Sequence, residues 1–150
     1  MGLKVKKKVV EYIDFDALRK DPARTIAAVC RINMGDLLTV LETHPGVYAY
    51  AVASLEVAKA REARVAIGLK RAEAATVKGL LSTDEKLAEW KARRLLVDNT
   101  EVRWHTDRLL RMQRRVGILT ALVEALQTRR DMLIQLAARA RSEYNATGAH

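Results

Sequence analysis

Apolar residues recur at two positions in every seven along the last third of the chain. One series begins at Val102 and the other at Met112, and the two together comprise Val102, Leu109, Met112, Val116, Leu119, Val123, Leu126 and Leu133. Such spacing draws a single apolar stripe along an α-helix and is typical of helices that pack lengthwise against a neighbour. It predicts a long helix that follows residues 97–101 and runs to Tyr144. We expect the stripe to mediate self-association, although a helical hairpin within one chain produces the same periodicity.

A first helix is predicted near the N-terminus. Asp21 can accept hydrogen bonds from free N–H groups, and Pro22 suits the first helical position because its missing N–H is not needed there. The helix should extend over residues 22–42. Gly35 is expected to interrupt it, and the sequence Thr-His-Pro-Gly at 43–46 is expected to end it.

A second helix is predicted over residues 47–78, where Gly79 should terminate it. Residues 82–85 have the Ser-x-x-Glu spacing of a capping box, which predicts a short helix reaching Arg94. Asp98 and Glu101 have the same capping-box spacing, which predicts the start of the long C-terminal helix.

These elements predict an all-α protein of long helices that forms an oligomeric helical assembly, preceded by a short extended N-terminal arm. The arm is the β-branched, lysine-rich stretch at residues 5–15. We divide the chain into residues 1–81, which hold the arm and a basic helix, and residues 82–150, which hold the short capped helix and the C-terminal oligomerisation helix. Both parts are expected to form one structural unit.

Charge is the main compositional indication of function. The 150 residues include 27 basic and 18 acidic ones, which gives a net charge of +9 and an isoelectric point near 10.0. An excess of this size favours an acidic partner, and nucleic acid is the commonest one. A basic helical protein without such a partner is the plain alternative.

The positions of the cations in the helix at residues 57–75 sharpen this interpretation. At about 100° per residue, one narrow arc holds the apolar residues Ala58, Val65, Leu69 and Ala72. Cations border it on both sides: Arg61, Arg64 and Arg71 on one flank, Lys59 and Lys70 on the other. This pattern fits two alternatives: a surface helix whose cations are solvated, or a helix whose cations bind a polyanion.

A second basic run lies between residues 91 and 115. Its candidate phosphate-binding residues in the C-terminal helix are Arg103, Arg108, Arg111 and Arg115. Trp90 and Trp104 lie in or beside the run, and exposed aromatic rings can stack on the bases of a single strand. Burial in a core is the alternative for both tryptophans.

No residue pattern indicates catalysis, a metal or a cofactor. The histidines at 44, 105 and 150 have no metal-ligand spacing with one another or with Cys30, which is expected to be a small buried apolar residue. Asp14 and Asp16 are more simply helix-capping residues than an acid–base pair. We therefore expect a non-enzymatic protein without cofactors.

Localisation is predicted from the same sequence features. No run of about 18 apolar residues could span a membrane. The N-terminus lacks the pattern of a secretory signal, and a single cysteine fits a reducing compartment. The expected location is the cytoplasm, which would be the host cytoplasm if a phage encodes the chain.

Several segments in order resemble the UvsY family of phage recombination mediators. These are a lysine-rich start leading into Tyr-Ile-Asp, the sequence VAKAR at 57–61, KGLLSTDE at 78–85, and a long C-terminal helix that ends ALQTRRDMLIQLAARARSEY. The likeness covers most of the chain. It differs from the family pattern by Ala58 and by the additional Arg64, Lys70 and Arg71.

The resemblance implies a homo-oligomer, which could be a ring, that binds single-stranded DNA. It would help a RecA-like recombinase to load onto DNA covered by single-strand-binding protein. The Lys-x-Arg motif that contributes to DNA binding in the family matches Lys59 and Arg61 here. Two alternatives stay open: an oligomeric adaptor or virion structural protein with an acidic protein partner, and an architectural protein that binds duplex DNA.

Overall fold

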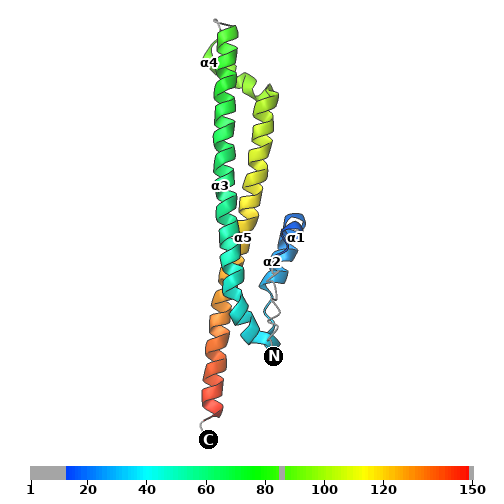
Figure 1. The fold of residues 1–150 in the computed structure, drawn as a ribbon, viewed down its shortest axis with the longest axis vertical. Helices are drawn as coiled ribbons and strands as arrows, with labels where there is room; N and C mark the ends of the chain where they lie inside the picture. The colour runs from blue at the N-terminus through cyan, green and yellow to red at the C-terminus, as the bar shows by residue number, and fades with distance from the viewer. Residues whose placement is uncertain (1–12, 85–86, 149–150) are drawn as a thin grey trace, which may run out of the picture. The chain divides into compact units, whose positions relative to one another are not determined.

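The computed structural model describes residues 13–84 and 87–148, and all regular structure within these ranges is helical. The elements, shown in Figure 1, are α1 (Phe15–Lys20), α2 (Pro22–Cys30), α3 (Leu37–Thr83), α4 (Glu89–Leu95) and α5 (Thr100–Thr147), with single 3₁₀ turns at Met34–Asp36 and Leu96–Asp98. The prediction of an all-α fold with long helices is confirmed. Residues 5–12 of the predicted arm lie outside the described residues, and its last residue, Phe15, is already the first residue of α1.

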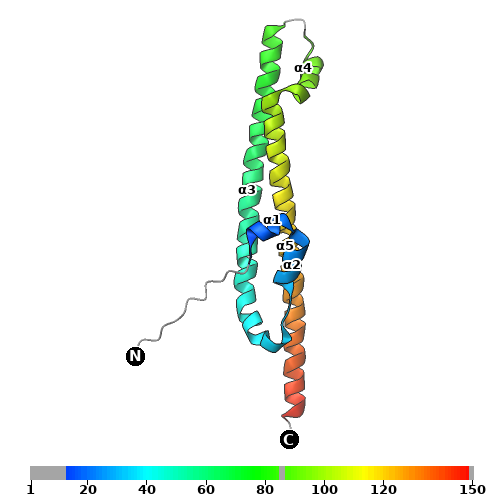
Figure 2. The same ribbon diagram turned by 90° about the vertical axis from the view of Figure 1, so that its right-hand side faces the viewer.

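The chain forms two compact units. The terminal unit combines Met1–Ala53 with Thr120–His150, and the central unit is Ser54–Leu119. Both long helices contribute to each unit, so α3 and α5 run side by side and antiparallel within it (Figures 1 and 2).

In the terminal unit, α1 packs with α2, and Phe15 of α1 meets Tyr50 of α3 edge-on with ring centroids 5.7 Å apart. The Asp14 carboxylate caps α1 by accepting from the N–H groups of Asp16 and Ala17, both at 2.9 Å, as expected for a capping residue. Asp21 and Pro22 start α2 as predicted. The buried apolar residues form an aliphatic core and are Leu18, Val47, Ala51, Leu122, Leu126 and Leu133.

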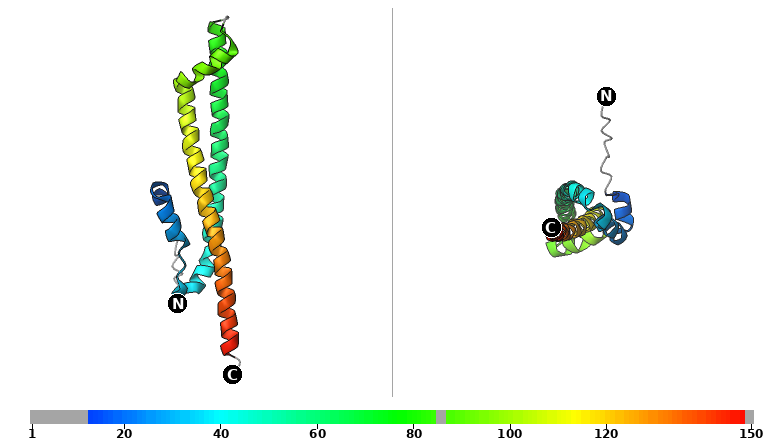
Figure 3. Two further views of the ribbon diagram at one scale, coloured as in Figure 1. Left: turned by 180° about the vertical axis from the view of Figure 1, so that it is seen from behind. Right: turned by 90° about the horizontal axis from the view of Figure 1, so that it is seen from below.

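The core of the central unit combines alanines with larger aliphatic residues. Its buried residues are Leu55, Ala58 and Ala72 of α3, Ala92 of α4, and Val102 and Leu119 of α5. Small side chains allow helices to approach closely, and Figure 3 shows the two long helices lying alongside each other from a second direction. The apolar arc predicted around Ala58 and Ala72 therefore does face the interior, with Val65 and Leu69 half-buried.

The predicted end of a helix at residues 43–46 is wrong, because α3 continues through Pro45 and Gly46. Proline removes one N–H from the helical ladder and crowds the carbonyl four residues earlier. The neighbouring His44 and Val47 are both buried, at 4% and 2% exposure. Packing on both sides of the proline holds the helix together where local propensity would end it.

The predicted boundary around Gly79 is also wrong. The helix runs on to Thr83, where the hydroxyls of Ser82 and Thr83 donate to the Gly79 carbonyl at 2.8 and 2.9 Å. Ser82 thus lies in the last turn of α3 and does not cap α4, which begins at Glu89 after Ala88 without a side-chain cap. The Glu85 half of the predicted capping box lies outside the described residues.

Two further boundaries differ from the predictions by a few residues. The predicted helix over 22–42 is interrupted, but α2 already ends at Cys30, ahead of Gly35. At the start of α5, the Asn99 Oδ1 accepts hydrogen bonds from the backbone N–H groups of Glu101 and Val102, at 3.0 Å each. Asp98 belongs to the preceding 3₁₀ turn. The C-terminal helix extends to Thr147, three residues beyond Tyr144.

The heptad stripe of α5 is largely covered within one chain. Val102, Leu119, Leu126 and Leu133 are at most 5% exposed, and the other four stripe residues, Leu109, Met112, Val116 and Val123, are half-buried. This burial is what the hairpin interpretation of the periodicity requires. None of the described helices is long and apolar enough to cross a membrane.

Candidate nucleic-acid interface

The cations proposed from the sequence all belong to the central unit. Ser54–Leu119 contains fifteen basic and nine acidic residues, a net charge of +6. The terminal unit, Met1–Ala53 with Thr120–His150, contains twelve basic and nine acidic residues, a net charge of +3. The central unit therefore carries the larger share of the net positive charge.

The nine candidate cations are all exposed: Lys59, Arg61, Arg64, Lys70, Arg71, Arg103, Arg108, Arg111 and Arg115. Lys59 forms an ion pair with Glu56 at 3.0 Å. Within residues 13–84 and 87–148, the other eight have no acidic side chain in ion-pair contact. Their charge is available to a partner in solution.

Three arginines of α5 line up with a tryptophan. Trp104, Arg108, Arg111 and Arg115 follow at intervals of four, three and four residues. At about 100° per residue they fall within an arc of about 60°, so they form one stripe along the helix. Arg103 lies about a third of a turn away from this stripe and is not part of it.

A contact between His105 and Gly68 brings the stripe to the arginine flank of α3. Two ring atoms of His105 lie 3.4 Å from the position a Cβ would occupy at Gly68. Gly68 is four residues after Arg64 and three before Arg71, on the same flank of α3. His105 also meets the ring of its neighbour Trp104 edge-on, with centroids 4.7 Å apart.

These contacts assemble one surface, which we call the arginine face. It consists of Arg61, Arg64 and Arg71 of α3 with Trp104, Arg108, Arg111 and Arg115 of α5. The sequence predicted each of its cations but could not place the two helices side by side. Nothing in the sequence singled out Gly68, whose lack of a side chain makes room for the histidine ring.

The remaining candidates, Lys59, Lys70 and Arg103, lie on the other flanks of the two helices. Lys70 lines an open groove of about 220 Å³ together with Glu73, Ala74 and Val77 of α3 and with Arg93 and Leu96 near α4. Arg93 already forms an ion pair with Glu89 at 2.8 Å. This side of the unit is therefore of mixed charge.

Both tryptophans lie at the surface and not in the core. Trp90 is 57% exposed and Trp104 is 51% exposed. Each has cations close to its ring: Lys91 and Arg94 lie 5.5 and 5.7 Å from the Trp90 centroid, and Arg108 lies 5.2 Å from that of Trp104. An exposed ring beside a cation can contact a base and a phosphate together.

The terminal unit has a different electrostatic feature, which is a buried arginine. Arg129 is 9% exposed, and its guanidinium lies 3.4 Å from both His44 Nδ1 and the carbonyl oxygen of Arg31. Burial lowers the pKa of His44 below its ordinary value, and the charges of Arg129 and Arg130 lower it further. Burial also raises the pKa of the Cys30 thiol, against the effect of the Arg129 charge.

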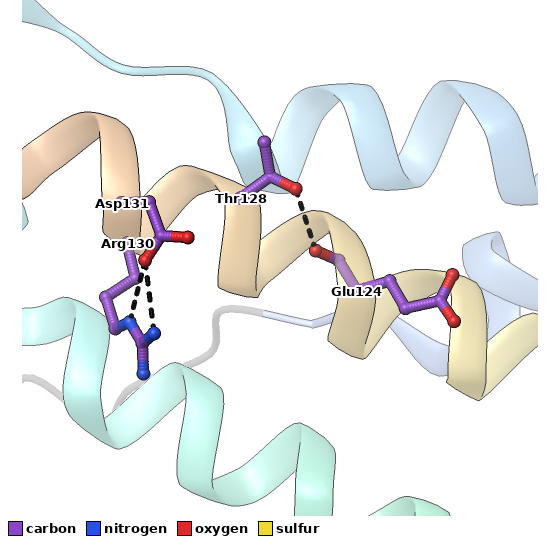
Figure 4. Close-up of polar contacts among 4 residues, drawn as sticks. All are labelled: Glu124, Thr128, Arg130 and Asp131. Carbon is purple, nitrogen blue, oxygen red and sulfur yellow. Dashed lines mark hydrogen bonds and ion pairs between the residues drawn. The ribbon is translucent and has the colours of Figure 1, made fainter.

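Arg130, next to this cluster, occupies a heptad position of the predicted stripe. Its side chain is exposed and forms hydrogen bonds through Nε and Nη2 to the carboxylate of Asp131, at 3.2 and 3.1 Å (Figure 4). Two residues before Arg130, the Thr128 hydroxyl donates to the carbonyl of Glu124 at 3.1 Å. The heptad pattern is thus interrupted by a locally neutralised cation.

No family model, curated protein or solved structure that was compared with this chain matches it. Among the described residues, no group of three or more histidine, cysteine, aspartate or glutamate side chains could hold a metal ion. Inferences about function therefore depend on the arginine face, the tryptophans and the resemblance described above.

Proposed function

We propose that this chain binds single-stranded DNA as a homo-oligomer and acts as a recombination mediator of the UvsY type. The observation that carries the proposal is the arginine face, which holds six exposed arginines, none in an ion pair within residues 13–84 and 87–148, and an exposed tryptophan whose ring lies beside one of them. Arginine is suited to phosphate because its planar guanidinium donates several hydrogen bonds and stays charged.

The distribution of charge supports a polyanion as the ligand. The central unit has an excess of six positive charges, twice the excess of three on the terminal unit. Neutralising phosphates releases counterions, and this gain grows with the number of cations in contact. A chain of phosphates can use all the arginines of the face, which a small anion cannot do.

Self-association would multiply this weak surface. Several copies of the arginine face on one assembly raise the effective concentration of binding sites along one strand, so the whole assembly binds more tightly than a subunit. The apolar stripe of α5 that is buried at Leu133 continues to Ala140 and Tyr144, which are exposed in the described structure. These last turns offer an apolar surface to another copy.

The mediator role comes from the resemblance. A non-enzymatic protein that holds single-stranded DNA would loosen the grip of single-strand-binding protein and assist a RecA-like recombinase. In this role the protein needs no catalytic group and no cofactor.

The test compares two triple variants with the same loss of charge. Arg64, Arg108 and Arg111 are changed to Ala on the arginine face, and the exposed Lys70, Arg103 and Arg114 are changed to Ala on the other flanks. Binding to a labelled single strand is then measured at several salt concentrations. The first variant should lose affinity, and its slope of log affinity against log salt should fall by about 0.7 per lost phosphate contact.

The matched variant should keep most of its affinity and slope. Equal losses of affinity in both variants would mean that the net charge of the protein, and not the position of its arginines, determines binding. If the wild-type protein fails to bind single-stranded DNA at low salt, the proposed function is wrong, and an acidic protein partner becomes the better hypothesis. Stronger binding to duplex would favour an architectural role.

A further inference from the structure

Trp104 combines three properties that phosphate binding alone does not require. It is 51% exposed, the Arg108 guanidinium lies over its ring at 5.2 Å from the centroid, and it belongs to the same stripe as Arg111 and Arg115. We propose that Trp104 is a base-stacking site and that it sets the preference of the arginine face for single-stranded over duplex DNA. This inference rests on the proposed function and names the residue that determines its specificity.

One edge of the Trp104 ring contacts a residue that packs against α3. His105 meets it edge-on at an interplanar angle of 84°, and the same histidine ring lies against Gly68 at the middle of the arginine flank of α3. Because no side chain intervenes at Gly68, the histidine is seated between the two helices. A fixed aromatic ring loses little conformational entropy when a base stacks on it.

Stacking distinguishes the two forms of DNA for a geometric reason. Bases of a single strand expose their faces and can stack on an indole or between an indole and a guanidinium. Bases within a duplex cover one another's faces, whereas its phosphates remain as accessible as those of a single strand. The arginines should therefore attract both forms, and only the tryptophan should discriminate between them.

The division of roles predicts separable effects of substitution. Trp104→Ala should weaken binding to a short single strand by about five- to a hundred-fold, the range that corresponds to the loss of one stacked base. Its binding to duplex and its salt slope should stay close to wild type. Arg111→Ala should instead weaken both forms and lower the salt slope.

Matched variants control for the loss of apolar surface and of the ring. Leu110 is 58% exposed on the same helix but lies on the opposite flank from the stripe, so Leu110→Ala should leave both affinities unchanged. Trp104→Phe keeps a ring and should retain most of the single-strand preference, while Trp104→Leu should behave like Trp104→Ala. Circular dichroism of each variant checks that helix content is retained.

Fluorescence gives a direct reading of the contact. The chain has two tryptophans, so Trp90→Phe leaves Trp104 as the only one. Adding oligo(dT) to this variant should quench the emission, and adding duplex at the same phosphate concentration should quench it much less. Iodide should reach the indole less easily once the single strand is bound.

The outcomes separate this inference from the proposed function. If the protein binds single strands but Trp104→Ala retains full affinity and oligo(dT) leaves the emission unchanged, the stacking site is disproved and the phosphate-binding face survives. Equal loss of single-strand and duplex affinity in Trp104→Ala would also disprove it. Absence of any DNA binding by the wild type would remove both proposals together.

Discussion

At the scale of residues, the least expected feature is the cationic side chain of Arg129 in the interior of the terminal unit. Its guanidinium has contacts at 3.4 Å with His44 and the Arg31 carbonyl, and its Nε has no hydrogen-bond partner among the described residues. A buried charge without a carboxylate disfavours a second charge nearby. For this reason the neighbouring histidine should stay neutral in the folded protein.

This arrangement predicts a pH dependence of stability. The pKa of His44 is lowered in the folded state by burial and by Arg129 and Arg130, relative to its ordinary value of 6.5. The unfolded chain therefore binds a proton before the folded one does, and the free energy of unfolding should fall as pH drops below 6.5. Chemical denaturation at about pH 7.5, 6.5 and 5.5, values that span the pKa of histidine in the unfolded chain, measures this change in the free energy of unfolding.

His44→Asn supplies the control for that measurement, because asparagine keeps a polar group near Arg129 but does not titrate. The variant should lose the component of the pH dependence that the histidine contributes. An identical slope in wild type and variant would show that other groups cause the dependence.

At the scale of elements, boundaries depend on which side chain actually reaches the free N–H groups. The start of α5 is capped by Asn99, although Asp98 is the better match to the sequence signal. Asn99→Ala should lower the free energy of unfolding by about 1 kcal/mol, the usual cost of removing an N-cap. Asp98→Ala, which removes no described cap hydrogen bond, should cost clearly less in the same urea titration. The reverse order would show that Asp98 caps the helix in solution.

At the scale of the whole molecule, one chain already uses most of the apolar stripe of α5. Replacing Leu119 or Leu126, at 2% and 0% exposure, with a charged residue would disrupt the fold before it affected assembly. The exposed continuation of the stripe is the better place to test self-association. Ala140→Glu together with Tyr144→Glu should lower the oligomer mass measured by light scattering, with helix content unchanged, because charges there oppose apolar contact.

Ser142→Glu with Asn145→Glu is a suitable comparison for that pair, since it adds the same charge at exposed neutral positions in the last turns of α5 but off the stripe. It should preserve the oligomer mass. A wild-type protein that is monomeric at all accessible concentrations would show that the stripe serves the hairpin alone.

The sequence by itself determined the fold class and most of the candidate cations. Helical periodicity and the scarcity of proline and glycine depend on local backbone physics, so long helices were predictable without tertiary information. The arginines and lysines were found because solvated charges follow the same helical period. The start of α2 at Asp21 and Pro22 was likewise local.

Only the tertiary structure decided which residues act together. Burial of His44 and Val47 carries α3 through Pro45, and no local signal can report that packing. The contact of His105 with Gly68 depends on two segments 37 residues apart in the chain meeting side by side, and it places the arginines of α3 beside those of α5. The surface position of Trp104 follows from the same pairing, because an aromatic residue on a helix is core or surface according to where its neighbour packs.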